Sequence, residues 1–202
     1  IRSLFHPNLL VHYKEYLLLL IKHSYAQAFF LQQDVLHILC SPPYLLIYLP
    51  IHLFDVEVGD AQGSYRESDT FSPGNDIVSI ETPVGNIGLT ICFDLRFPEQ
   101  YQALRDAGAD IILIPAAFTH TTGEAHWEIL LKARAIETQC YVLAANQCGW
   151  HDDKRRTWGH SMIVGPWGDT LGMLHESPGV IVADVDLTEL ANVRKKMPLT
   201  RS

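Results

Sequence analysis

The sequence predicts an α/β fold over residues 51–199, and three observations support that prediction. Apolar runs of strand length alternate there with stretches of helical periodicity. Gly, Pro, Asn and Asp residues separate the runs. The chain has 202 residues, of which 48% are hydrophobic and 19% charged, so it is long enough to bury a core. With no internal repeat or low-complexity tract, this composition excludes disordered, collagen-like and coiled-coil proteins.

The predicted elements follow one another with short connections. In chain order they are strands at 77–81 and 87–93 joined by a turn at 83–86, a helix at 97–108, a strand at 111–114, a helix at 124–137, a strand at 141–145, a hairpin of 161–164 and 170–171, a strand at 179–185 and a helix at 186–196. Strands are predicted where apolar residues alternate or form a short β-branched run. Helices are predicted where apolar residues recur every three or four positions, as at Tyr101 and Leu104.

Residues 1–50 differ in composition from the rest of the chain. They are rich in Leu and His, and their apolar residues form blocks without a clear helical or strand period. Residues 17–21 and 45–49 are compatible with short buried strands. Charged residues and two prolines interrupt every apolar block before it reaches the roughly 18 residues of a membrane span. We therefore expect a domain boundary at residue 50, no signal peptide, no membrane partner and a cytoplasmic location.

The charges and the cysteines exclude several classes of function. The formal net charge is −8, and the 15 Lys and Arg residues are scattered along the chain, so we expect no nucleic-acid partner. Cys40, Cys92, Cys140 and Cys148 form no CxxC motif and share no repeating interval. That spacing argues against a zinc knuckle and against a secreted disulfide framework. An enzyme with free thiols that acts on small molecules fits these observations.

Cys92 is the position with the most chemical information. It lies at the end of a predicted buried strand, a few residues before a predicted helix. A thiol on such a tight strand-to-helix turn points into a cleft, and the helix N-terminus favours its ionised form. The Phe93 N–H can then face a developing oxyanion. The alternative is that Cys92 is a small buried hydrophobic residue, as free cysteines usually are.

A thiol that attacks an amide needs a base to accept its proton. The candidate bases are His52, His120, His126 and Glu67. His120 and His126 are six residues apart with no third ligand at helical spacing, so neither a metal nor another cofactor is expected. Asp94 and Arg96 are expected to pair and to shape the turn beside Cys92. The charged run 152–156 is expected to be a solvated loop.

Several strings along the chain resemble motifs of one enzyme family. The string GLTICFDLRFPE at 88–99 resembles the nucleophile motif of the nitrilase superfamily, the carbon–nitrogen hydrolases. Further strings in the family's order and spacing are those at 52–56, 118–128, 134–137 and 159–162. Residues 135–142 and 165–168 are similar to the deaminated glutathione amidase branch in particular. The resemblance covers residues 51–199.

The resemblance implies an αββα sandwich, incomplete at the N-terminus, that hydrolyses a carbon–nitrogen bond without a metal. It places Cys92 at the nucleophile position, where a thioester forms, ammonia leaves and water releases the acid. It makes Glu67 a supporting glutamate that orders a catalytic lysine, whereas a glutamate in such a loop, taken without the resemblance, is more often a solvated carboxylate. The expected substrate-binding residues are Phe93, Phe118, Thr122 and His126. A homodimer is a further implication of the resemblance.

Two positions depart from the family's pattern. The family's catalytic lysine stands two residues before the string at 52–56, where this chain has Pro50, and proline has neither a charge nor a donor. The general-base glutamate belongs further upstream, and nothing in residues 1–49 resembles its motif. We therefore expect residues 1–50 to be foreign to the fold, from a mis-predicted exon, read-through or a divergent splice form. Residues 51–199 are then a partial hydrolase domain.

Two functions from different classes follow from these observations. The first is an amidase for a small linear ω-amide such as deaminated glutathione, of which this chain is a damaged copy. The second is a catalytically inactive relative that binds a ligand or a partner. Because one oxyanion donor alone contributes about 10²–10³ in rate, the residue at position 50 discriminates between them. A thiol hydrolase that uses His52 or His126 as its base is a third alternative.

Overall fold

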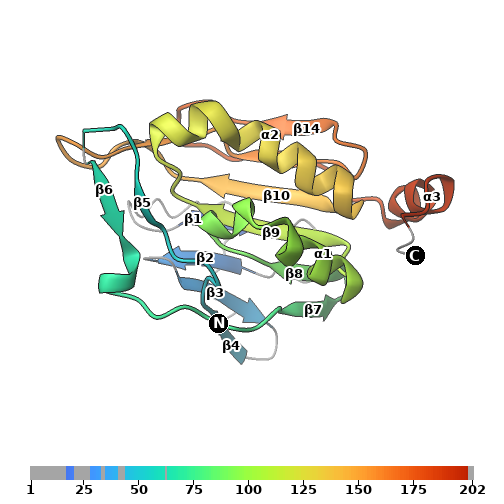
Figure 1. Ribbon diagram of the computed structural model, residues 1–202. Coiled ribbons are helices and arrows are strands. Elements are labelled where there is room, and N and C mark those ends of the chain that lie inside the picture. The colour runs from blue at the N-terminus through green and yellow to red at the C-terminus, as the bar shows by residue number, and fades with distance from the viewer. Residues whose placement is uncertain (1–16, 21–27, 33–34, 41–43, 62, 200–202) are drawn as a thin grey trace, which may run out of the picture.

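The computed structural model describes residues 17–20, 28–32, 35–40, 44–61 and 63–199, and its centre is a six-stranded mixed sheet (Figure 1). In spatial order the strands are β14 (Thr170–Met173), β13 (Met162–Val164), β10 (Tyr141–Asn146), β9 (Ile111–Ala116), β8 (Gly85–Leu89) and β7 (Ser79–Thr82). Strands β8, β9 and β10 are parallel, and the remaining pairs are antiparallel. The predicted α/β fold is confirmed.

Helices connect the parallel strands because a tight turn cannot join two parallel neighbours. The 3-10 helix η2 (Cys92–Arg96) and helix α1 (Pro98–Asp106) lead from β8 to β9, and α2 (His120–Thr138) leads from β9 to β10. Both α-helices lie on the same face of the sheet (Figure 1). Thr119 caps α2 by accepting a hydrogen bond from the Thr122 N–H at 3.3 Å. This cap explains why α2 begins before the predicted helix at 124–137.

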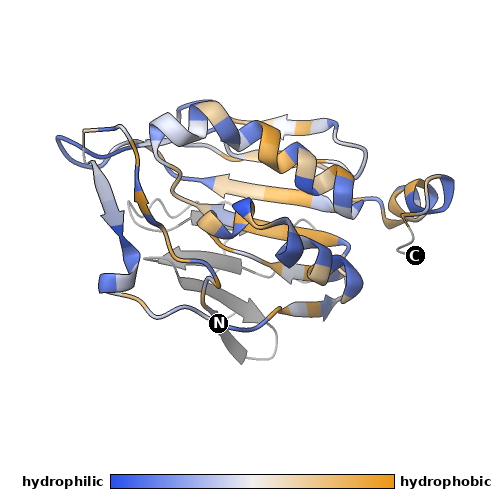
Figure 2. Cartoon of the chain, in the orientation of Figure 1, coloured by the Kyte–Doolittle hydropathy of each residue, from blue (hydrophilic) through white to orange (hydrophobic). Residues whose placement is uncertain are grey.

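The sheet separates two hydrophobic clusters. Strands β9 and β10 are buried along their whole length, and Figure 2 shows most of each strand in the hydrophobic colour. Successive side chains of a strand point to opposite faces. Ile112 therefore packs with Trp127 on the helix side, while Leu113 packs with Tyr48 and Leu190 on the other side. Central strands buried on both faces explain the continuous apolar runs in the sequence.

Smaller elements surround this sheet. They are the antiparallel sheet of β1 (Leu17–Leu20), β2 (Ala28–Gln32), β3 (Val35–Cys40) and β4 (Tyr44–Tyr48), the hairpins of β5 (Asp55–Glu57) with β6 (Ser64–Arg66) and of β11 (Cys148–Trp150) with β12 (Arg156–Trp158), the 3-10 helix η1 (Glu67–Asp69) and helix α3 (Leu187–Lys196). The strands expected at 17–21 and 45–49 correspond to β1 and β4. Helix α3 lies at the opposite end of the sheet from β5 and β6 (Figure 1). The domain boundary at residue 50 stays a prediction.

One predicted strand is too long, and another is wrong. The strand expected at 87–93 ends at Leu89, because an Asp94 carboxylate oxygen accepts a hydrogen bond from the Ile91 N–H at 3.0 Å and the chain turns into η2. Residues 179–185 form no strand, although the structure describes all of them. Their alternation is real, since Ile181 and Val185 pack against the sheet while Val182 is exposed. The period of two therefore comes from one-sided packing without a strand partner.

Candidate active site

A pocket opens at the carboxyl ends of β8 and β9. This end of parallel strands is where ligands bind in open α/β sheets. The pocket is a cavity of about 40 Å³. Its lining residues are Phe54, Tyr65, Glu67, Cys92, Phe93, Arg96, Ala117, Phe118, Thr119, Thr122 and Arg155. The structure thus brings together five of the six predicted site residues, namely Cys92, Glu67, Phe93, Phe118 and Thr122.

Cys92 lies on a strained turn at the base of this pocket. Its φ of 44° is in the left-handed region, while the preceding Ile91 is extended with φ −136° and ψ 129°. A non-glycine residue in that region is costly unless its surroundings hold it, and such residues concentrate at functional sites. The half-buried thiol contacts both hydrophobic clusters. The local geometry is that of a nucleophile on a sharp strand-to-helix turn.

Asp94 holds this turn against the segment that precedes β5. The fully buried carboxylate accepts hydrogen bonds from the backbone N–H groups of Ile51 (3.2 Å) and His52 (3.0 Å), besides the bond from Ile91. The His52 imidazole Nδ1 also lies 3.0 Å from Asp94 Oδ1. Asp94 and Arg96 both lie in the described part of the chain, and they form no ion pair with each other. The expected pairing is therefore wrong. The carboxylate shapes the turn through backbone amides instead.

Arg96 reaches the pocket from the last position of η2. Its guanidinium lies over the rings of Phe93 (5.8 Å to the centroid) and Phe118 (5.2 Å), an arrangement that attracts a cation. Its Nη1 lies 3.3 Å from the Nδ1 of His126. Burial lowers the pKa of Arg96, and the charge of the Cys92 thiolate opposes that shift. The sequence predicts only a structural role for Arg96, although its position four residues after Cys92 is a signal that the two can share a site.

Glu67 and a set of aromatic rings form the outer wall. Glu67 Oε2 accepts a hydrogen bond from the Phe54 N–H at 2.7 Å, which fixes the segment after His52 to η1. The Phe54 ring contacts the rings of Tyr65 and Phe93, each at 5.1 Å between centroids. Burial raises the pKa of Tyr65, whose hydroxyl donates to Asp60. At neutral pH this phenol is therefore a neutral donor.

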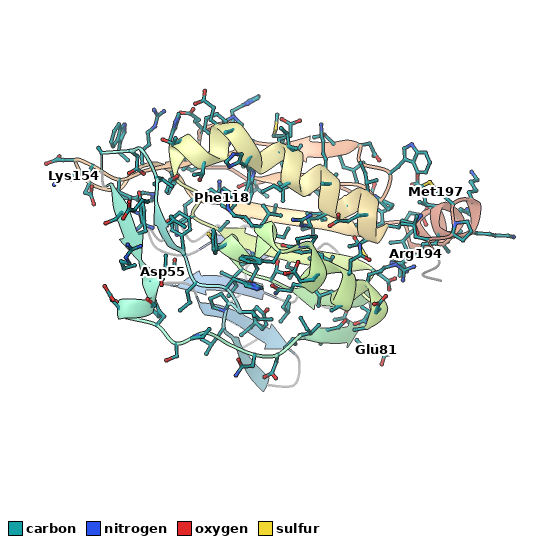
Figure 3. The ribbon with its side chains drawn as sticks, in the orientation of Figure 1. Asp55, Glu81, Phe118, Lys154, Arg194 and Met197 are labelled. Carbon is teal, nitrogen blue, oxygen red and sulfur yellow. The ribbon has the colours of Figure 1, made fainter. Side chains whose placement is uncertain are left out.

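The start of α2 and the β11–β12 hairpin close the remaining side. Phe118 lies where the chain passes from β9 to α2 (Figure 3), and its N–H donates to Asn146 Oδ1 at 2.9 Å. A Cβ at Gly123 would come within 2.2 Å of Trp158, so glycine is required where this hairpin packs on the helix. The packing brings exposed Arg155 to the pocket, although the sequence analysis expected a solvated loop there. A run of charges in the sequence gives no signal of such a contact.

The histidines proposed from the sequence lie outside the pocket lining. His126, an expected substrate-binding residue, is exposed and contacts Arg96. His120 lies 3.4 Å from Glu176 and against Trp158. His52 stacks on Phe97 at 3.5 Å, with Asp94 at its Nδ1. In this geometry His126 is a neighbour of the pocket, and His52 and His120 belong to its supporting structure.

Pro50 is buried close to the turn that holds Cys92. Its carbonyl accepts a hydrogen bond from the Gly74 N–H at 2.8 Å, and the next two backbone amides donate to Asp94. A Cβ at Gly74 would meet the Leu49 carbonyl oxygen at 2.7 Å, so only glycine allows this approach. The backbone of position 50 is therefore fixed beside the turn, although its side chain cannot supply an ammonium group.

The other described thiols lack these features. Burial raises the pKa of Cys140 and of Cys148, which disfavours their thiolates. Within the described ranges, no group of three or more His, Cys, Asp and Glu side chains is arranged to hold a metal ion. None of the described helices is both long and apolar enough for a membrane crossing. Cys40 belongs to β3, and its side chain lies outside the described residues.

Comparisons with known proteins match most of the described chain. The family model "Carbon-nitrogen hydrolase" matches residues 24–195. Among curated proteins, the deaminated glutathione amidase of Yersinia enterocolitica is 53% identical over 152 residues, which are 75% of this chain and 53% of that protein. The chain spans about half the length of the curated relatives it matches.

Solved structures of the same kind share the fold. The NitFhit protein of C. elegans superposes with a TM-score of 0.71 at 38% identity, over 88% of this chain and 41% of that one. A variant of the amidase from Nesterenkonia sp. AN1, solved after Michael addition of acrylamide at its active-site cysteine, gives a TM-score of 0.64 at 28% identity, over 80% of this chain and 60% of that one. The predicted nitrilase-like fold is confirmed, with only part of each relative represented.

Proposed function

The chain belongs to the carbon–nitrogen hydrolase family, and from this premise we propose that it is an amidase of a small linear ω-amide such as deaminated glutathione, with Cys92 as nucleophile. One observation supports the proposal most strongly: the left-handed turn that presents Cys92 to the pocket. The relatives named deaminated glutathione amidase support the substrate class.

The proposed reaction has two steps. The Cys92 sulfur attacks the amide carbon, a carbon–sulfur bond forms, the carbon–nitrogen bond breaks, and ammonia leaves with the thiol proton. Water then attacks the thioester, which releases the carboxylic acid and restores the thiol. The Phe93 N–H, next in the chain after the nucleophile, is the proposed donor to the oxyanion. Phe118 and Thr122 bind the substrate on the side of α2, while Glu67 supports the opposite wall through Phe54.

A second candidate function is favoured by Pro50. Without an ammonium group at this position, the tetrahedral intermediate lacks one stabilising cation, and one such donor contributes about 10²–10³ in rate. In this alternative the chain is a relative that binds a small amide, or reacts with it once, without turnover. The same pocket would then serve as a binding site.

Labelling combined with a turnover assay tests both candidates. The protein is treated with iodoacetamide, its intact mass is measured, and hydrolysis of deaminated glutathione is followed by release of ammonia. We expect one label at neutral pH that Cys92→Ala removes and Cys148→Ala retains, together with ammonia release that Cys92→Ala abolishes. Labelling of Cys92 without ammonia release supports the binding relative. A Cys92 no more reactive than Cys148, without ammonia release, contradicts the amidase and favours a relative that only binds.

The compartment and the oligomeric state belong to the proposal as well. Cys92, Cys140 and Cys148 form no disulfide, which fits the reducing cytoplasm. A homodimer is supported by the family resemblance alone. Fractionation of the natural source and sedimentation of the purified protein measure the two properties directly.

A further inference from the structure

Of the half-buried and buried arginines that the structure describes, Arg96 and Arg105 form no ion pair with a carboxylate, and Arg96 is the one that lines the pocket. Arg134 pairs with Glu137 at 2.8 Å, Arg194 pairs with Asp110 at 2.9 Å, and Arg156 pairs with Glu176. Among the residues that the structure describes, no carboxylate forms an ion pair with Arg96. A cation withdrawn from water is costly without an anion nearby. The positive charge of Arg96 is therefore available to a group in the pocket.

The Cys92 sulfur is the group that the geometry offers. Cys92 and Arg96 are the first and last residues of η2 and line the same cavity of about 40 Å³. Both side chains are half-buried, so water screens the interaction between their charges less than it does at the surface. Poor screening strengthens the attraction between opposite charges. A thiolate at Cys92 is stabilised electrostatically by this positive charge. The side chain of Pro50 has no charge and cannot provide such stabilisation.

Three contacts hold the guanidinium on the pocket side. The rings of Phe93 and Phe118 attract it from below, and His126 contacts Nη1 from the exposed surface of α2. An Arg N–H can only donate, so His126 must present an unprotonated Nδ1 as acceptor. His126 thus contacts Arg96 from outside the lining, which explains why an expected substrate-binding residue does not reach the cavity.

We propose that Arg96 is the cation that stabilises the Cys92 thiolate, and that His126 is a positioning residue that holds Arg96. The proposal rests on the proposed role of Cys92 as nucleophile. On ionisation the Sγ–H bond breaks, its electron pair stays on sulfur, and the proton passes to water or buffer. Arg96 keeps its proton throughout, since a guanidinium does not titrate at the pH values at which a thiol ionises.

Other charged or titratable groups also face this sulfur and its partner. They are Glu67 of η1, Tyr65 of β6, Asp94 of η2, Arg155 of the β11–β12 loop and His126 of α2. Tyr65 is neutral because burial raises its pKa. Asp94 is engaged by the donors of residues 51, 52 and 91. Arg155 is exposed, so water screens its charge. Of the two arginines that line the pocket, Arg96 is therefore the half-buried one.

The pH dependence of alkylation tests the proposal without requiring turnover. Rates of Cys92 modification by neutral iodoacetamide are measured from about pH 5 to about pH 9 in the parent, Arg96→Met, Arg96→Lys and His126→Ala. We expect Arg96→Met to raise the midpoint by about one pH unit, which lowers the rate at pH 6 about tenfold. Lysine should recover part of the shift, and His126→Ala should give a smaller shift of the same sign. Arg66→Met, which removes an exposed guanidinium outside the lining, is the matched control.

The outcomes distinguish a failure of the role proposed for Arg96 from a failure of the role proposed for Cys92. If Cys92 reacts readily and its midpoint is the same in Arg96→Met as in Arg66→Met, the role of Arg96 is wrong while the nucleophile stands. If Arg96→Met slows anionic iodoacetate but leaves iodoacetamide unchanged, Arg96 binds a substrate carboxylate and the thiolate proposal is overturned. If Cys92 reacts no faster than Cys148 in the parent, both proposals fail. Circular dichroism of each variant confirms that the fold is retained.

Discussion

Two segments that meet at Asp94 differ in what their side chains supply. The segment 91–96 presents Cys92 on a strained turn, with Arg96 and Phe93 beside it. The segment 48–54 approaches from the other side and is fixed by backbone bonds to the same carboxylate and to Glu67. Its backbone is fixed by these bonds, yet Pro50 stands at the position where the resemblance implies a catalytic lysine. Backbone geometry at a site can thus be present where the reacting group is not.

The difference follows from how each segment is held. The bonds to Asp94 and Glu67 use main-chain N–H groups, which every residue except proline has. They therefore specify the path of the chain and not the side chains that it displays. Cys92 is different, because both the turn and the thiol are needed for the proposed chemistry. Variants that separate the path of the chain from its chemistry test this contrast.

The largest effect is expected from breaking the junction itself. Asp94→Ala removes an acceptor from three backbone N–H groups, one of which belongs to fully buried Ile91. Because unsatisfied buried donors keep their desolvation cost, we expect a loss of about 3 kcal/mol in the free energy of unfolding. Urea titration measures it, with exposed Asp184→Ala as the control. Equal midpoints for the two variants would contradict the role of Asp94.

The second effect is expected on the rate of the reaction, while the backbone keeps its path. Pro50→Lys restores an ammonium group at a position whose neighbours already donate to Asp94. If the remaining site is built, we expect the rate of ammonia release from deaminated glutathione to rise about 10²-fold, the typical contribution of one oxyanion-stabilising group.

Pro50→Met, which has a long side chain without a charge, is the control for that measurement. A rise in rate with both variants would mean that proline itself distorts the segment. No rise with lysine would mean that a further group is missing, which favours the binding relative. Labelling of Cys92 should be retained in both variants, since neither changes the turn.

Predictions from the sequence succeed where local chemistry and backbone agree. Strands β9 and β10 are predicted as apolar runs because both of their faces are buried. The turn at Cys92 is predicted because a strand and a helix follow each other closely there. The end of β8 is missed because the cause is one side-chain bond from Asp94 to a backbone amide. Apolar periodicity contains no information about such a bond.

Arg155 and the junction at Asp94 show a second limit. Arg155 reaches the pocket only because Gly123 lets the β11–β12 hairpin pack on α2, some thirty residues away in the chain. Asp94 bonds to residues 51 and 52 across a separation of more than forty residues. These contacts depend on tertiary packing, and a pattern within a short window cannot report them. Glu67, which the resemblance marks as a supporting residue of the site, lines the pocket, and its supporting role stays a prediction.

The smallest effect is expected from a change that acts on the segment 48–54 alone. Gly74→Ala places a Cβ within 2.7 Å of the Leu49 carbonyl oxygen, a backbone atom that cannot rotate away, so we expect a loss of about 1–3 kcal/mol in the free energy of unfolding. Gly59→Ala is the matched control, since its Cβ would meet no atom within 4 Å. Urea midpoints measure the stability, and iodoacetamide reports the turn at Cys92. Since Asp94 links the two segments through residues 51 and 52, loss of stability with unchanged Cys92 labelling would show that the turn keeps its shape when its neighbour shifts. Loss of both would show that the junction transmits the strain, and that the two segments form one unit.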